Sequence, residues 1–424
     1  MAASMRVCWA VLLAMLSWAS EAAPTYRVDY RIGFDPARKE ASVVIEVEPG
    51  KGRLHSLRFT MDPKRYREIA GDGEVVRKGD SVTWTLPKSG GHLSYRYRID
   101  HRRKGGGYDA RITPEFAIVR GDDLVPRATA RSSRGARSQA TLRADLPAGW
   151  TSLETAWQAI TDERVFAVDD PDRSFDRPTG WIMAGDLGVR RDVVGANAEV
   201  CARCIRGWCG GDCMGISVAA PKGDIMRRND TLAIIHATAP EMRAAFGALP
   251  EKILIVGAGD PMWRGGLSGP RSLFLHPDRP LISENGTSTL VHELTHVITR
   301  LHAEPGDDWI VEGIAEFYSM ALLNRAGLLS DARLERGLAW MRNHGRAVKR
   351  LHTSRSAGPR TARAVVLFAA LDAEIRQRTH DERSLDEVAR ALRKRREVSL
   401  SDLREISERV IGAPAKTLDT PLLD

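Results

Sequence analysis

The segment TSTLVHELTHVITRLHAEPGDDWIVEGIAEFYS, residues 287–319, constrains the fold more than any other part of the chain. Apolar residues recur at helical spacing in its first half and predict a helix over 290–301. His292 and His296 are four residues apart, so both imidazoles leave the same face of that helix. Glu293 is turned away by about 100°, where it can reach a water molecule without binding a metal. Candidate N-caps are Asn285, Thr287 and Ser288.

This HExxH arrangement predicts a zinc site, which needs a third protein ligand. Glu312 follows a Pro-Gly turn and lies on a second predicted helix that can return over the first. His302 lies six residues after His296, but the sequence shows no helix break between them. Glu316 is one turn beyond Glu312 and is a weaker candidate for the third ligand, since a position behind the ligands or facing solvent suits it better. We therefore expect His292, His296 and Glu312 to bind one zinc ion, with His302 as the alternative third ligand.

The N-terminus has the pattern of a secretory signal peptide. A single basic residue, Arg6, precedes an apolar run over 7–19 and a group of small residues. This pattern predicts a signal peptide over residues 1–22, cleaved after Ala22 or Ala23. The apolar run is shorter than the about 20 residues that span a bilayer. We expect a periplasmic or secreted protein without stable membrane insertion.

The chain is basic, with a net charge of +8 over 424 residues. Its arginines and lysines are spread along the sequence with acidic residues among them. This distribution is typical of a solvated surface rather than a nucleic-acid groove, so no nucleic-acid partner is expected. Nothing in the sequence specifies an oligomeric state.

Four cysteines remain after signal cleavage, in the stretch CARCIRGWCGGDC. They are Cys201, Cys204, Cys209 and Cys213. The spacing fits either two local disulfides or a small zinc knuckle, and export to an oxidising compartment favours disulfides. The connectivity is left open. We expect a stapled loop with a structural role.

The mature chain divides into three regions by pattern. Residues 23–190 alternate apolar and polar side chains between turn signals and predict an antiparallel β-sandwich. Strands give way to helices over 191–350, and 351–424 reads as a helical bundle. Ser384 and Ser399 are the expected N-caps of the last two helices. The predicted fold class is α+β.

HELTH followed by DDWIVEGIAEF resembles the gluzincin zinc peptidases. The similarity is to the aminopeptidase N family and to the glycyl-aminopeptidase-like family, without the latter's PDZ domain. In those families a D-x-W-x-x-E-G segment supplies the glutamate ligand, and Asp307, Trp309, Glu312 and Gly313 match it. The resemblance implies a thermolysin-like catalytic region over 191–350 that uses Glu293 as general base on peptide or protein substrates.

The segment GGLSG resembles a G-G-L-E-H edge strand of the glycyl-aminopeptidase-like family. Gly265, Gly266 and Leu267 match, and the resemblance implies that this strand runs beside the bound peptide. The family's glutamate, which holds a free substrate amine, is replaced by Ser268. Aminopeptidase and endopeptidase specificity therefore both stay open.

The same families place an oxyanion-stabilising tyrosine on a later helix, where this chain has TARA, residues 361–364. The last tyrosine, Tyr318, is six residues past Glu312 and should face the other side of its helix. Substitute donors could be His344, His352 or Arg360.

Two hypotheses follow: an exported zinc metallopeptidase, or a zinc-binding but catalytically weak relative that acts as a binding or scaffold protein in the cell envelope. A metal-free interaction protein is disfavoured because Glu293 and all three ligands are present.

Overall fold

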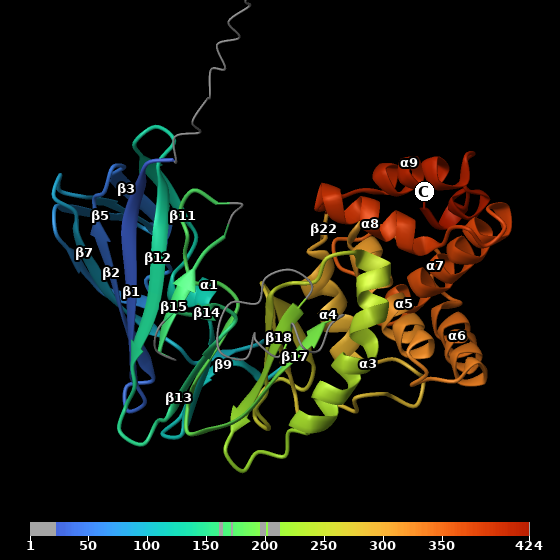
Figure 1. The fold of residues 1–424 in the computed structure, drawn as a ribbon, viewed down its shortest axis with the longest axis horizontal. Coiled ribbons are helices and arrows are strands. Elements are labelled where there is room, and N and C mark those ends of the chain that lie inside the picture. The colour runs from blue at the N-terminus through green and yellow to red at the C-terminus, as the bar shows by residue number, and fades with distance from the viewer. Residues whose placement is uncertain (1–22, 161–163, 171–172, 196–200, 202–212, 424) are drawn as a thin grey trace, which may run out of the picture.

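The structure is a computed structural model that describes residues 23–160, 164–170, 173–195, 201 and 213–423. It is a mixed α+β fold, which confirms the predicted class. Sheets from the first half of the chain lie at one end of the molecule, and helices from the second half lie at the other (Figure 1). A further sheet with β17 and β18 lies between them (Figure 1). The predicted signal peptide, residues 1–22, falls outside the described residues.

Three sheets account for most of residues 25–185. The largest has the order β14-β15-β12-β1-β2-β7-β4 and consists of β1 (Thr25–Asp35), β2 (Glu40–Glu48), β4 (Tyr66–Gly71), β7 (Gly91–Arg98), β12 (Arg137–Asp145), β14 (Gln158–Ala159) and β15 (Val165–Val168). A second has the order β11-β3-β6-β5, from β3 (Leu54–Thr60), β5 (Glu74–Lys78), β6 (Ser81–Thr85) and β11 (Ala128–Ser132). The third has the order β13-β16-β10-β9-β8, from β8 (His101–Arg102), β9 (Tyr108–Ile112), β10 (Phe116–Arg120), β13 (Ser152–Thr155) and β16 (Trp181–Gly185).

Alternating apolar residues explain these strands. In β1 every second side chain, from Tyr26 to Phe34, is buried, and together with the inward residues of the other strands they form one hydrophobic core. The pairing is antiparallel as expected, with one exception. β1 and β12 run parallel over Thr25–Gly33, which the alternation alone could not predict because it is the same for both directions.

The central sheet has the order β17-β18-β19-β21-β20. It consists of β17 (Leu187–Gly195), β18 (Cys213–Pro221), β19 (Lys252–Val256), β20 (Gly266–Gly269) and β21 (Ser272–Leu275). β18, β19 and β21 are parallel and read as continuous apolar runs because both faces are covered. A small apolar cluster that includes Trp181 and Phe274 joins this sheet to β16 and β10. β20 pairs antiparallel at the edge.

Helices cover the rest of the chain. They are α1 (Gly121–Leu124), α3 (Arg228–Phe246), α4 (Thr289–Thr299), α5 (Asp308–Arg325), α6 (Asp331–Gly345), α7 (Pro359–Arg378), α8 (Leu385–Arg395) and α9 (Leu400–Ile411), with 3₁₀ turns at Lys416–Leu418 and Pro421–Leu423 and a two-stranded ladder of β22 (His302–Ala303) and β23 (Glu397–Val398). Both expected N-caps are confirmed, since Ser384 and Ser399 each form a capping box. No helix in the described part of the chain is long and apolar enough to cross a membrane.

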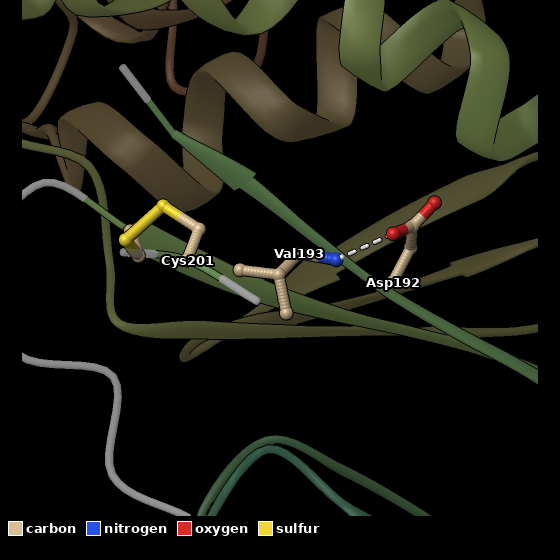
Figure 2. Close-up of a disulfide and its surroundings, with 4 residues drawn as sticks. Asp192, Val193 and Cys201 are labelled. Carbon is tan, nitrogen blue, oxygen red and sulfur yellow. Dashed lines mark hydrogen bonds between the residues drawn. A yellow bond between two sulfur atoms is a disulfide. The ribbon is translucent and has the colours of Figure 1, made fainter. Parts of the chain in front are cut away.

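A disulfide joins Cys201 to Cys213 at the start of β18, beside Val193 of β17 (Figure 2). This agrees with the expected stapled loop. It also means that these two cysteines are not available as thiolates for a zinc knuckle. Cys204 and Cys209 lie outside the described residues.

Candidate metal centre

α4 presents the two histidines and is defined by its caps. The Ser288 side chain accepts a hydrogen bond from the backbone N–H of Val291 at 3.3 Å, which fixes the start of the helix. The helix ends at Thr299 because Arg300 adopts a left-handed conformation with φ of 55°. This end is two residues earlier than the sequence pattern predicts. It carries His302 into β22, where its side chain is exposed and away from the metal candidates.

α5 presents Glu312, and the matched residues around it hold the helix in place. Asp307 accepts hydrogen bonds from the Trp309 indole at 3.3 Å and from the backbone N–H of Leu400 at 2.8 Å. Trp309 is buried and stacks on Phe368 of α7. A Cβ at Gly313 would lie 2.7–2.8 Å from α7 side chains, so only glycine allows this close approach. The motif residues therefore fix α5 against α7 and aim Glu312 at α4.

Among the described residues, His292, His296 and Glu312 are the one group of three whose ligand atoms lie close enough to share a metal ion. The two Nε2 atoms are 3.1 Å apart, and the carboxylate oxygens of Glu312 lie 3.5 Å from His292 Nε2 and 3.6 Å from His296 Nε2. Tetrahedral zinc with bonds of about 2.05 Å needs ligand atoms about 3.3 Å apart. Two imidazoles and one carboxylate at these separations fit zinc and leave its fourth position for water.

The charges of the group also suit a metal. Burial lowers the pKa of His296 to about 4, helped by the charge of His292, so its imidazole is neutral at neutral pH. Burial raises the pKa of Glu312, but the hydrogen bond from His292 and the histidine charges lower it overall, so the carboxylate is ionised. These are the protonation states of metal ligands.

Glu316 supports His292 from behind. Its carboxylate accepts a hydrogen bond from Nδ1 of His292 at 2.8 Å, which leaves Nε2 directed at the metal position. Burial lowers the pKa of His292, but its hydrogen bonds to Glu312 and Glu316 outweigh this and raise it. Metal binding at Nε2 must therefore release a proton. Sequence spacing predicted this supporting position for Glu316.

Glu293 is nearly enclosed, with 7% of its surface exposed. Burial raises the pKa of its carboxyl group, and the charge of His292 and the nearby hydroxyl and backbone N–H of Ser268 oppose the rise without cancelling it. Ser268 therefore contacts Glu293 itself. The backbone of Gly266 also lies directly against Glu293, because a Cβ built on Gly266 would be 2.6 Å from Glu293 Cγ.

Replacing Gly266 with alanine is expected to push Glu293 out of position and to lower kcat/KM for peptide hydrolysis by about 100-fold, the typical cost of a displacement near 1 Å. Gly269→Ala on the same strand is the matched control, since its Cβ would meet nothing closer than 3.5 Å. Peptide hydrolysis and bound zinc should be measured for both variants. Equal activities would show that the contact with Gly266 does not set the position of Glu293.

β20 is confirmed as an edge strand beside α4, and part of its edge is already occupied. The carbonyl of Ser268, on the outer edge, accepts from Arg120 at 3.2 Å. The carbonyl of Leu267, which faces β21, also accepts from the Trp181 indole at 2.9 Å. Alternate residues of a strand point their backbone groups to the same side, so Gly266 shares the outer edge with Ser268. Gly266 also lines the cleft, so its backbone is the part of this edge considered for pairing with a peptide.

The candidate metal centre lies in a cleft of about 1380 Å³. Gly265, Gly266, Leu267 and Ser268 line one side of it. Other residues that line the cleft include Arg103, Arg336, Trp340 and Arg355, none of which the sequence marked as a site residue. Trp340 is 45% exposed and stacks on His344 at 4.6 Å between ring centres. Arg336, Trp340 and His344 are spaced four residues apart, which predicts that their side chains share one face of a helix. Nothing in the sequence placed that helix, α6, beside the metal position.

The segment where the resemblance expects the family's tyrosine offers only a short side chain at the cleft. Thr361 lines the cleft, and its hydroxyl is hydrogen-bonded to that of Ser356 at 3.0 Å. Tyr318 faces away, and its hydroxyl donates to Asp386 at 2.8 Å. Of the substitutes considered from sequence, His344 lines the cleft and His352 and Arg360 do not.

No family model matches the sequence, and no curated protein matches it. Solved structures do match. An aminopeptidase N family protein from Idiomarina loihiensis has a TM-score of 0.60 at 13% identity, over 94% of this chain and 74% of that one. An M1 zinc metallopeptidase from Deinococcus radiodurans has a TM-score of 0.58 at 16% identity, over 95% and 93% of the two chains. Aminopeptidase A from Legionella pneumophila has a TM-score of 0.55 at 12% identity, over 96% of this chain and 50% of that one.

These likenesses extend over nearly the whole described chain, from the N-terminal sheets to the C-terminal helices. They confirm the resemblance to the aminopeptidase N family at the level of the fold. At identities this low, the three-dimensional arrangement rather than the sequence carries the similarity. The chain therefore has the fold of the M1 zinc metallopeptidases.

Proposed function

We propose that this protein is an exported zinc metallopeptidase of the gluzincin type that hydrolyses peptide bonds. The observation that carries the proposal is the grouping of His292, His296 and Glu312 next to a buried Glu293, all facing one cleft. The fold shared with M1 zinc metallopeptidases supports it. A protein that shared only the fold would not be expected to have these residue types at these distances.

Each residue of the site has a separate role in the proposed reaction. His292, His296 and Glu312 would hold one zinc ion, which supplies a Lewis acid and lowers the pKa of a bound water. Glu293 takes the proton of the attacking water and delivers it to the leaving amine. Its burial excludes bulk water from the carboxylate, and Ser268 lies beside it. Gly266 of β20 would pair with the backbone of an extended peptide.

The proposed organisation follows the sequence division. We assign residues 23–190 to an N-terminal β-sandwich, 191–350 to a thermolysin-like catalytic region and 351–424 to a helical bundle. Separate hydrophobic cores within 26–184 and within 194–423 support the first boundary. Residues 1–22 would direct export to the periplasm or the medium, where the disulfide at Cys201 is stable.

The substrate is proposed to be a peptide or protein. Variants of a two-domain M1 zinc metallopeptidase hold L-tryptophan and L-arginine, and aminopeptidase A from Legionella pneumophila holds aspartic acid. By analogy the cleft of this chain would accept peptide residues near the metal. Ser268 leaves no acidic side chain at the position expected to hold a free amine, so a free N-terminus is not proposed as a requirement.

Metal content and hydrolysis of a mixed peptide library, measured on the same mature protein, test the proposal. We expect one zinc ion per chain and cleavage that a chelator abolishes and added zinc restores. The cut sites, read by mass spectrometry, report whether free amines are needed. Zinc at one per chain with no cleavage of any peptide would reject the peptidase.

That result would favour the alternative, a zinc-binding relative of low activity that serves as a binding or scaffold protein in the cell envelope. The specific observation behind this alternative is Thr361, whose short, already bonded hydroxyl stands where a tyrosine would stabilise the oxyanion. Loss of one such donor typically lowers the rate by about 100- to 1000-fold.

A further inference from the structure

The cleft is lined by several arginines, and their side chains differ in how they are held. Arg264 is paired with Asp260, Arg279 donates to Thr289 at 3.2 Å, and Arg103 lies 3.6 Å from Asp109. Arg336 and Arg355 also line the cleft. In the described part of the chain, the guanidinium groups of these two make no hydrogen bond or ion pair.

Of the two, Arg355 is next to the helix that carries Glu312. The residue after it, Ser356, is bonded to Asp308, which lies one turn before Glu312 on α5, and Arg355 and Glu312 line the same cleft. The backbone of Arg355 is fixed. The carbonyl of Arg355 accepts from the Thr353 hydroxyl at 3.3 Å, and the next backbone N–H, that of Ser356, donates to Asp308 at 2.6 Å.

A fixed backbone with an unpaired guanidinium is suited to binding an anion. The planar fork of arginine matches a carboxylate with two parallel hydrogen bonds. The residues of β20 that line the same cleft agree with this charge preference. Ser268 is neutral and is directed at Glu293, so β20 offers no carboxylate to a substrate amine. Asp308, which also lines the cleft, already accepts from Ser356.

Building on the peptidase function proposed above, we propose that Arg355 is a specificity-determining residue that binds a carboxylate of the substrate close to the bond that is cut. The cleft then favours peptides with a negative charge at that place, instead of a free amine. The carboxylate can belong to the substrate's C-terminus or to an acidic side chain. Both present the same group to the guanidinium.

Binding to the zinc-loaded full-length Glu293→Gln variant tests this without turnover. Calorimetry would compare Ala-Ala-Phe-Ala as the free acid and as the C-terminal amide, and acetyl-Ala-Asp-Phe-Ala-amide with its Asn counterpart. We expect the carboxylate member of at least one pair to bind about 10- to 100-fold more tightly, as for a charge-assisted hydrogen bond. The first pair reports a C-terminal carboxylate and the second an acidic side chain.

Arg355→Gln, added to that background, is expected to abolish the preference, and Arg355→Lys to keep part of it. Arg350→Gln is the matched control, because Arg350 is exposed, lies on the same connection and does not line the cleft. Equal binding within both pairs, or a preference that survives Arg355→Gln, overturns the proposal. Arg355→Gln made in the protein with Glu293 intact gives a further check. A fall in kcat that is the same for charged and neutral peptides would indicate oxyanion stabilisation and would also overturn the proposal.

The proposed peptidase function can be rejected independently of the proposed role of Arg355. If the protein with Glu293 intact cleaves none of the peptides, the proposed function is rejected. The binding preference and its dependence on Arg355 would still be measurable in that case. A carboxylate preference without cleavage would then assign the cleft to a protein that binds acidic peptides.

Discussion

Replacing Glu293 with glutamine is expected to lower kcat/KM for peptide hydrolysis by about 100- to 10,000-fold, the usual contribution of a general base. Bound zinc should stay at one per chain, because Glu293 is not among the three groups that converge on the metal position. Glutamine has the shape of glutamate and still offers a carbonyl oxygen to the two donors of Ser268. The loss would therefore come from the missing proton acceptor.

Hydrolysis of a quenched fluorescent peptide and metal analysis by mass spectrometry check this expectation on the same samples. Glu284→Gln is the matched control, since Glu284 is an exposed glutamate that lines the same cleft. It should keep activity close to that of the unmodified protein. Near-normal activity of Glu293→Gln would exclude Glu293 as the base. Loss of zinc in that variant would instead assign it to metal binding.

The metal group was predictable because its parts are close in sequence and sit on two helices. The spacing of His292 and His296 fixes their shared face, and the turn before α5 returns Glu312 to them. The N-cap was predictable only as one of three candidates, Asn285, Thr287 and Ser288, since all three side chains can cap a helix, and Ser288 is the one that does. The helix end was not predictable, because Arg300 takes a left-handed conformation that sequence rules expect of glycine or asparagine.

What could not be predicted depends on contacts between distant segments. Arg120 occupies part of the outer edge of β20 from 148 positions away in the sequence. Arg355 and Trp340 reach the cleft through the packing of α6 and α7, which no local pattern encodes. The alternation of β1 predicted its burial but not its parallel partner. Local periodicity reports which face is buried, and the fold decides what lies opposite.

Replacing Glu312 with alanine is expected to lower zinc affinity by more than about 100-fold, because residues that only support ligands already account for 10- to 100-fold. His302→Ala should leave zinc affinity unchanged. The backbone N–H of His302 donates to Arg396 at 2.7 Å in the β22–β23 ladder, and its side chain is exposed. Competition titrations with a zinc chelator measure both affinities directly.

Thermal unfolding gives a second readout that does not depend on activity. A ligand at 1,000 times its Kd stabilises the folded state by about 4 kcal/mol. Added zinc should therefore raise the melting temperature of the unmodified protein and of His302→Ala, and have little effect on Glu312→Ala. The alternative coordination requires the opposite pattern. It would need α4 to present His302 beside His292 and His296, and the left-handed turn at Arg300 followed by the β22 ladder directs it elsewhere. A zinc-dependent shift that is lost in His302→Ala and kept in Glu312→Ala would thus overturn both the ligand set and the end of α4.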